Sequence, residues 1–169
     1  MARSFRIGGL TVLLLTGLTI SPMLSNAQVV GDEAELGRLQ SKAEEAIGND
    51  DTDGAAMMMG RAALLAAQLG KREAGWNTAF RKSQEALFRS QEHTYRAMAL
   101  FRRAGGQLPA SSGVCGSLAL AHTSLTHVAE VKRPSPQDTR LLEEAKRLQE
   151  SADNWHQVIV SLVAEYQCS

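Results

Sequence analysis

The sequence lacks the short motifs that mark common catalytic and cofactor sites. It has no Cys-x-x-Cys-His motif for covalent haem attachment and no Gly-x-Ser-x-Gly motif for an exposed nucleophilic serine. The carboxylate pairs Glu44-Glu45 and Glu143-Glu144 are adjacent in sequence and suit a solvated helix face better than acid–base catalysis. We therefore expect a non-enzymatic protein without catalytic residues, cofactors or metal ligands. An enzyme of unrecognised type is the less favoured alternative.

The sequence also lacks an excess of charge of either sign. It contains 18 basic and 18 acidic residues. Such a balance provides no global attraction to nucleic acid or to anionic lipid, so we expect no nucleic-acid partner. Beyond the N-terminal segment, no uncharged apolar stretch approaches the ~20 residues that a membrane span needs. We therefore expect no stable membrane insertion once that segment has been removed.

The first 27 residues have the pattern of a Sec-type signal peptide. Arg3 and Arg6 precede an apolar run over residues 10–20, and Ala27 ends a group of small residues at the predicted cleavage point. An uncleaved anchor is disfavoured, because the apolar run is shorter than ~20 residues and Pro22 follows it. No cysteine lies in this segment, which argues against a lipid anchor. We expect a periplasmic or secreted protein with one domain over residues 28–169 and a net charge of about −2.

Only two cysteines are present, Cys115 and Cys168. Because exported proteins fold in an oxidising compartment, we expect these two residues to form a structural disulfide. Two free thiols are the alternative.

Apolar residues recur every three or four positions along most of the chain, and no segment has the pattern of a strand. The helices expected from this pattern cover residues 31–48, 52–69, 71–104, 114–132 and 136–166. The expected N-caps are Asp32, Thr52 or Asp53, and Ser135, and Gly70 is the expected C-cap of the second helix. Short turns between helices favour antiparallel neighbours. We therefore predict an all-α fold, an up-and-down antiparallel bundle of four to five helices.

The last helix has the most regular pattern. Its apolar positions alternate in steps of four and three, which is the 3.5-residue period of coiled-coil packing. These positions are Leu141, Ala145, Leu148, Ala152, Trp155, Ile159, Leu162 and Tyr166.

The expected helix lengths conflict with the expected disulfide. Cys115 begins a helix of ~17 residues and Cys168 ends one of ~32, so at ~1.5 Å per residue the far ends of a hairpin would differ by roughly 20 Å. A disulfide requires Cα atoms within about 7 Å. Either the last helix bends near residues 151–154, or the segment before Cys115 carries it along the bundle, or the bond does not form.

Histidine and methionine spacing does not favour a metal site. His122 and His127 are five residues apart, whereas ligand pairs on one helix are three or four apart. The Met57-Met58-Met59 run points its side chains in different directions, so we interpret these residues as core packing rather than a copper(I) site.

Charge is segregated along the chain. Residues 32–53 have a net charge of −6 and residues 71–103 a net charge of +5. The simpler interpretation is that the two segments neutralise each other across the bundle. The alternative is that a basic face contacts an acidic partner. Its candidate residues are Arg81, Lys82, Arg89, Arg96, Arg102 and Arg103.

The third helix has a second feature of interest, a stripe that includes the polar residues Ser83, Ser90 and Thr94. A partner helix could cover these positions, or the small residues Ala145 and Ala152 of the last helix could. Taken together, these patterns favour an exported helical bundle that acts by protein–protein interaction in the bacterial envelope, in an accessory, chaperone-like or immunity-type role. A periplasmic bundle that holds a metal or haem between helices is the second hypothesis.

Overall fold

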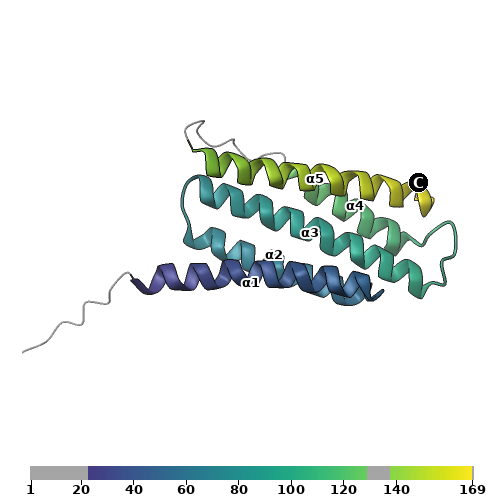
Figure 1. Cartoon of the computed structure of the whole chain (residues 1–169). Helices are drawn as coiled ribbons and strands as arrows, with labels where there is room; N and C mark the ends of the chain where they lie inside the picture. The colour runs from purple at the N-terminus through teal and green to yellow at the C-terminus, as the bar shows by residue number, and fades with distance from the viewer. Residues whose placement is uncertain (1–22, 129–137, 169) are drawn as a thin grey trace, which may run out of the picture.

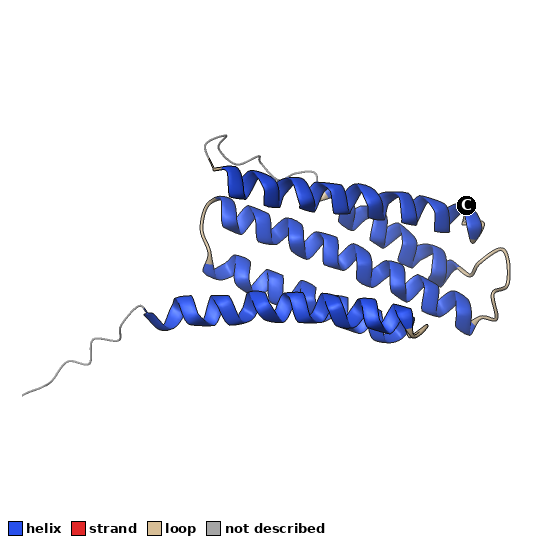
Figure 2. Cartoon of the chain, in the orientation of Figure 1, coloured by secondary structure: helices blue, strands red, loops and turns tan. Residues whose placement is uncertain are grey.

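The protein is built from helices packed side by side along their lengths (Figure 1). A computed structural model describes residues 23–128 and 138–168, and within them it contains five helices and no strand (Figure 2). The helices are α1 Met23–Gly48, α2 Thr52–Arg72, α3 Trp76–Arg103, α4 Ser112–Thr126 and α5 Thr139–Glu165. The prediction of an all-α fold is confirmed. No helix in the described ranges has both the length and the apolar character needed to cross a membrane.

The N-terminal ends of α1 and α2 differ from the prediction. α1 begins at Met23, so Asp32 lies inside the helix and does not cap it. α2 is capped by Asp51 rather than by Thr52 or Asp53, because the Asp51 carboxylate accepts a hydrogen bond of 2.8 Å from the Gly54 amide. Thr52 is buried instead.

Gly70 is not the C-cap of α2, which continues to Arg72. A Cβ atom at Gly70 would lie 3.1 Å from the Cβ of Arg81, so glycine here lets α2 and α3 approach closely. The chain turns at Gly75 instead, where φ is +63°, and α3 therefore starts at Trp76 rather than near Lys71.

The C-terminal end of α4 and the N-terminal end of α5 also differ from the prediction. α4 ends at Thr126, and Asp138 caps α5 by accepting a hydrogen bond of 3.2 Å from the Leu141 amide. The predicted start at Ser135 lies outside the described residues, as do positions 129–132 of the predicted fourth helix.

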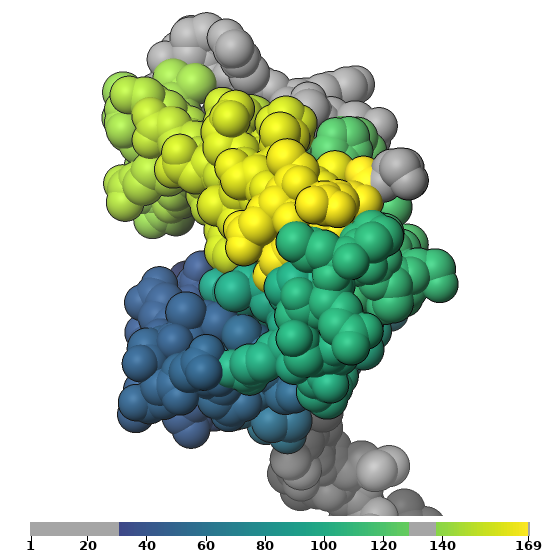
Figure 3. Space-filling view, turned by 90° about the vertical axis from the view of Figure 1, so that its right-hand side faces the viewer, coloured from purple at the N-terminus to yellow at the C-terminus, as the bar shows by residue number. Residues whose placement is uncertain are grey.

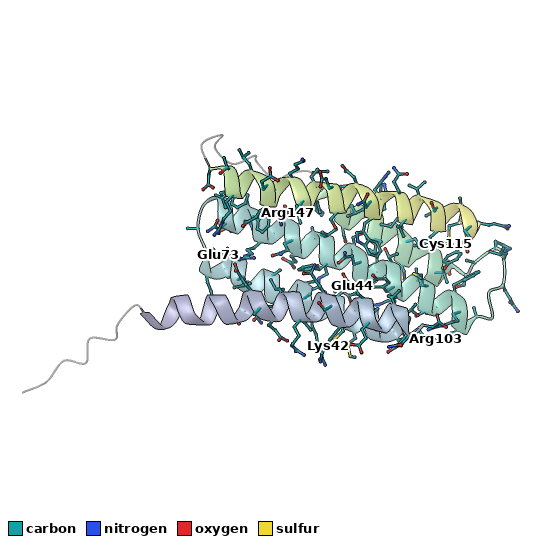
Figure 4. The ribbon with its side chains drawn as sticks, in the orientation of Figure 1. Lys42, Glu44, Glu73, Arg103, Cys115 and Arg147 are labelled. Atoms are coloured by element: carbon teal, nitrogen blue, oxygen red, sulfur yellow. A yellow bond between two sulfur atoms is a disulfide. The ribbon has the colours of Figure 1, made fainter. Side chains whose placement is uncertain are left out.

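Cys115 and Cys168 form a disulfide, with their Cα atoms 5.4 Å apart. Figure 4 labels Cys115 near the C-terminal end of α5. α5 is one continuous helix, so no bend is needed. α5 is longer than α4 by 12 residues, or about 18 Å, and the two helices meet at the disulfide end. The excess length lies at the other end, where residues 127–138 connect the two helices. The predicted conflict arose from aligning the helices at this connection.

α3 lies between two hydrophobic clusters. The first joins α1, α2 and α3 and contains Leu36, Leu39, Ala43, Ala55, Met59, Ala62, Ala63, Ala66, Leu69 and Phe88. The second joins α3, α4 and α5 and contains Ala86, Leu87, Ala121, Leu125, Val128, Leu148, Ala152 and Ile159. Four of the eight members of the α5 stripe are buried and the other four are half-buried, so the whole stripe faces the core, as its period predicts. Burying one leucine or isoleucine contributes about 1.5–3 kcal/mol.

A third, smaller cluster surrounds the disulfide end of the molecule. Its buried members are Ala97, Val114, Leu118 and Tyr166. The Tyr166 ring stacks on Phe101 with ring centroids 3.9 Å apart, so the C-terminal end of α5 packs on α3 as well as being bonded to α4.

The polar stripe on α3 is covered within the chain. Ser90 and Thr94 are fully buried, and the Thr94 hydroxyl donates a hydrogen bond of 2.8 Å to the Ser90 carbonyl oxygen. Ser83 is also buried. These residues therefore offer no surface for a partner helix.

Candidate partner-binding surface

The six basic residues singled out from the sequence do not share one face of α3. Lys82, Arg89 and Arg96 follow one another at intervals of seven residues, or about two helical turns, and Arg103 continues the series. These four residues therefore lie along one side of α3. Arg81 and Arg102 lie outside this stripe and have different partners.

Arg81 is a buried structural residue. Its side chain is 9% exposed and forms ion pairs with Glu73, at 3.2 Å, and with Glu33 of α1. Burial lowers the pKa of Arg81, but hydrogen bonds from its guanidinium to Glu73 and Glu33 outweigh burial and raise the pKa above its ordinary value. Arg81 thus remains charged and connects the start of α3 to α1, at the end of the bundle where Figure 4 labels Glu73.

At the opposite end of α3, two arginines bind the acidic segment around the start of α2. Arg102 forms an ion pair of 2.6 Å with Asp50, and Arg103 forms one of 2.7 Å with Asp53 (Figure 4). Together with the Arg81–Glu33 pair, these contacts support the interpretation that the two charged segments neutralise each other in part.

Glu92 holds two arginines of the stripe in place. Its carboxylate accepts hydrogen bonds from Arg89, at 2.9 Å, and from Arg96, at 2.6 Å, while its own side chain is 11% exposed. A Cβ atom at Gly60 of α2 would lie 3.1 Å from the Glu92 Cδ. The absence of a side chain at Gly60 therefore makes room for the carboxylate that orients both guanidinium groups.

A groove of about 520 Å³ runs between α2 and α3 beside these arginines, and we call it the α2–α3 groove. Its lining residues are Asp53, Ala56, Met57, Gly60, Arg61, Leu64, Arg89, Glu92, Arg96, Leu100 and Arg103. Four arginines stand against two carboxylates in this set, so the groove is basic. Met57 and Leu64 are 51% and 54% exposed, which adds apolar surface to the positive charge.

A second hollow of about 410 Å³ continues the basic surface between α3 and α4, where Lys82 and Arg89 contribute to its lining. Among residues 31–128 and 138–168, Lys82 and Arg61 form no ion pair. Their charges are therefore available to a partner.

Comparison with known proteins gives no guide to the function of this surface. No protein-family model, curated protein or solved structure matches the chain. The α2–α3 groove must therefore be interpreted from its own chemistry.

A different groove opens between α1 and α5 over α3, and it shows as a notch between the blue and yellow-green parts of the surface (Figure 3). It has a volume of about 530 Å³. Its lining includes Glu33, Glu73 and Glu144 as well as Arg81 and Arg140. Because charges of both signs are nearly balanced there, this α1–α5 groove has no preference for a partner of either charge.

The structure describes no group of three or more His, Cys, Asp or Glu residues that could hold a metal ion. Met59 is buried in the first cluster while Met57 is exposed, so the methionine run does not converge on one point. However, His122 of α4 and His156 of α5 have ring centroids only 5.4 Å apart. Sequence spacing missed this pair because it detects ligands within one helix and not across two.

Proposed function

We propose that the chain acts by binding an acidic, amphipathic helical segment of a protein partner in the α2–α3 groove. The observation that carries this proposal is the exposure of Met57 and Leu64 beside arginines that Glu92 holds in place. A groove between two helices suits an incoming helix, whose apolar face packs on exposed side chains while its carboxylates pair with arginine. Because Arg89 and Arg96 are already oriented, less side-chain entropy is lost on binding.

We further propose that the helices form an up-and-down antiparallel bundle. Two ion pairs support this arrangement, because each joins the C-terminal part of one helix to the N-terminal half of the helix before it. Arg72 at the end of α2 pairs with Asp32 of α1 at 2.6 Å, and Arg103 at the end of α3 pairs with Asp53 at the start of α2. The disulfide likewise joins the start of α4 to the end of α5.

The proposed compartment is the bacterial envelope, reached through removal of residues 1–27. The buried α1 residues that pack on α2 and α3 are Leu36, Leu39 and Ala43, all well after the proposed cleavage point at Ala27. Cleavage therefore leaves the described contacts of α1 in place. N-terminal sequencing of protein recovered from the periplasm or medium should begin at Gln28, and a product that retains Met1 in the cytoplasm would contradict export.

An accessory, chaperone-like or immunity-type role would each use such a surface, and the identity of the partner decides among them. The decisive experiment captures partners from envelope extracts with the wild-type protein and with an Arg61→Glu/Leu64→Gln variant. Both residues are exposed and line the groove, and neither change breaks an ion pair among the described residues. We expect the variant to retain the partner at least about tenfold less well, and binding to weaken as salt is raised.

An Arg140→Glu/Arg147→Glu variant is the matched control. Both residues are exposed on α5, and they line the α1–α5 groove and the neighbouring hollow. We expect this variant to bind like the wild type. Loss of binding in the control with retention in the groove variant would transfer the site to the α1–α5 groove, and a protein that retains no partner would contradict the proposal altogether.

A further inference from the structure

The pair His122 and His156 lies at the edge of the contact between α4 and α5. Both side chains are exposed, and their rings are tilted by 49° with centroids 5.4 Å apart. His122 directly follows Ala121, and His156 lies one helical turn after Ala152; both alanines are buried in the cluster that α4 and α5 share. Two imidazoles from different helices thus face solvent side by side.

Their separation matches the geometry of two imidazoles on one metal ion. With metal–nitrogen bonds of about 2.0–2.1 Å, two ring centres bound through one nitrogen each lie about 4.5 Å apart at the 90° angle that copper and nickel prefer, and about 5 Å apart at the tetrahedral angle of zinc. The observed 5.4 Å is slightly above both values, and exposed imidazoles are free to adjust it by rotation. Neutral imidazole is a ligand for zinc, copper and nickel, whereas magnesium and calcium require oxygen ligands.

We infer that His122 and His156 form a two-imidazole binding site for a divalent transition-metal ion. No third His, Cys, Asp or Glu of the described residues joins the pair, so water completes the coordination sphere and the site stays open to a further ligand. The ion connects α4 to α5 away from the disulfide, which already joins these helices at one end. Metal binding therefore stabilises the hairpin they form. This site is separate from the α2–α3 groove and does not depend on the proposed partner.

The test is a thermal unfolding series of the untagged protein with CuCl₂, NiCl₂, ZnCl₂ and MgCl₂. Any ion that binds only the folded state raises the melting temperature, and we expect a rise of about 3–5 °C with copper in excess. The effect should be larger for copper than for nickel or zinc, and magnesium should have none. His122→Ala and His156→Ala should each remove the rise. His127→Ala is the matched control on α4 and should keep it.

A second measurement does not depend on any variant. Paramagnetic copper added to the wild-type protein should broaden the backbone amide signals around residues 122 and 156 before all others. Broadening elsewhere, or a rise in melting temperature that survives both single alanine substitutions, would overturn the inference. An absence of any shift with copper, nickel and zinc would overturn it as well.

Discussion

At the scale of single residues, the glycines of the helices divide into those that are needed and those that are not. A Cβ atom at Gly37 of α1 would meet nothing within 4 Å, whereas one at Gly70 of α2 would lie 3.1 Å from the Cβ of Arg81. The first position is open, and at the second α2 and α3 are in close contact. Comparing the two sites therefore distinguishes the low helix propensity of glycine from its role in letting two helices pack closely.

We predict opposite effects of alanine at these two glycines. Gly37→Ala should stabilise the protein by about 0.5–1 kcal/mol, because alanine is the better helix former. Gly70→Ala should destabilise it by about 1–3 kcal/mol, because the added methyl group forces α2 away from α3. Urea unfolding measures both. If the Gly70→Ala variant were as stable as the Gly37→Ala variant, the inference that α2 and α3 need a glycine at position 70 would be wrong.

His93 of α3 is a residue whose protonation opposes folding. Its ring is half-buried, and its Nδ1 atom has no hydrogen-bond partner among the described residues. Burial lowers the pKa of His93 below its ordinary value of 6.5, with a smaller opposing effect from Glu92. The folded state therefore binds fewer protons than the unfolded state in the pH range just below 6.5.

This lowered pKa predicts a loss of stability in mild acid. The stabilisation is fully present above pH 6.5 and is lost as the pH falls from there through the folded-state pKa. Glutamine cannot be protonated in this pH range. The unfolding free energy of a His93→Gln variant should therefore decrease less than that of the wild type between pH 7.5 and 5.5. Urea midpoints at the two pH values test this, and parallel decreases in both proteins would exclude His93 as the cause.

At the scale of helices, the disulfide is the strongest single constraint. It joins residues that are 53 positions apart, and closing a loop of that length stabilises a fold by about 4 kcal/mol in the chain-entropy treatment. We expect reduction, or a Cys115→Ser/Cys168→Ser variant, to lower the unfolding free energy by about 3–4 kcal/mol. The reductant should leave the stability of the double serine variant unchanged. A similar effect on both proteins would mean that the reductant acts elsewhere.

The same helices show what periodicity can and cannot predict. The apolar stripe of α5 predicted buried residues from Leu148 to Tyr166, because the position of a side chain around a helix follows from its number alone. Helix ends were predicted less well, because the C-cap expected at Gly70 is replaced by a tertiary contact with Arg81. The capping of α2 by Asp51 was missed because the neighbouring Thr52 and Asp53 are equally good caps by residue type.

The candidate sites were predictable only where one helix contains them. The stripe from Lys82 to Arg103 is visible as a seven-residue repeat, whereas the burial of Arg81 depends on Glu33, 48 positions away. The His122–His156 contact depends on the register of α4 against α5, because the two residues lie on different helices. Such long-range registers leave no periodic signal in the sequence.

At the scale of the whole molecule, α3 couples two cores that share no residue among those the structure describes. Phe88 belongs to the cluster with α1 and α2, and the adjacent Leu87 belongs to the cluster with α4 and α5. Tyr95 packs on the first cluster while its ring makes an edge contact of 5.3 Å with Trp155, which packs on the second. Disorder in α3 would therefore expose both cores at once, so neither half should persist without the other.

We therefore predict a single cooperative unfolding transition. Loss of helix, measured by far-UV circular dichroism, should coincide with the change in tryptophan fluorescence. Trp155 contributes to this fluorescence and packs on the second core. Phe88→Ala should cost about 3–5 kcal/mol and shift both curves together, although Phe88 lies in the first core. Leu87→Ala, the neighbouring control in the second core, should cost about 2–5 kcal/mol and also shift both. If Phe88→Ala lowered the helical signal in a separate early step and left the fluorescence midpoint unchanged, α1 and α2 would unfold independently and α3 would not couple the two cores.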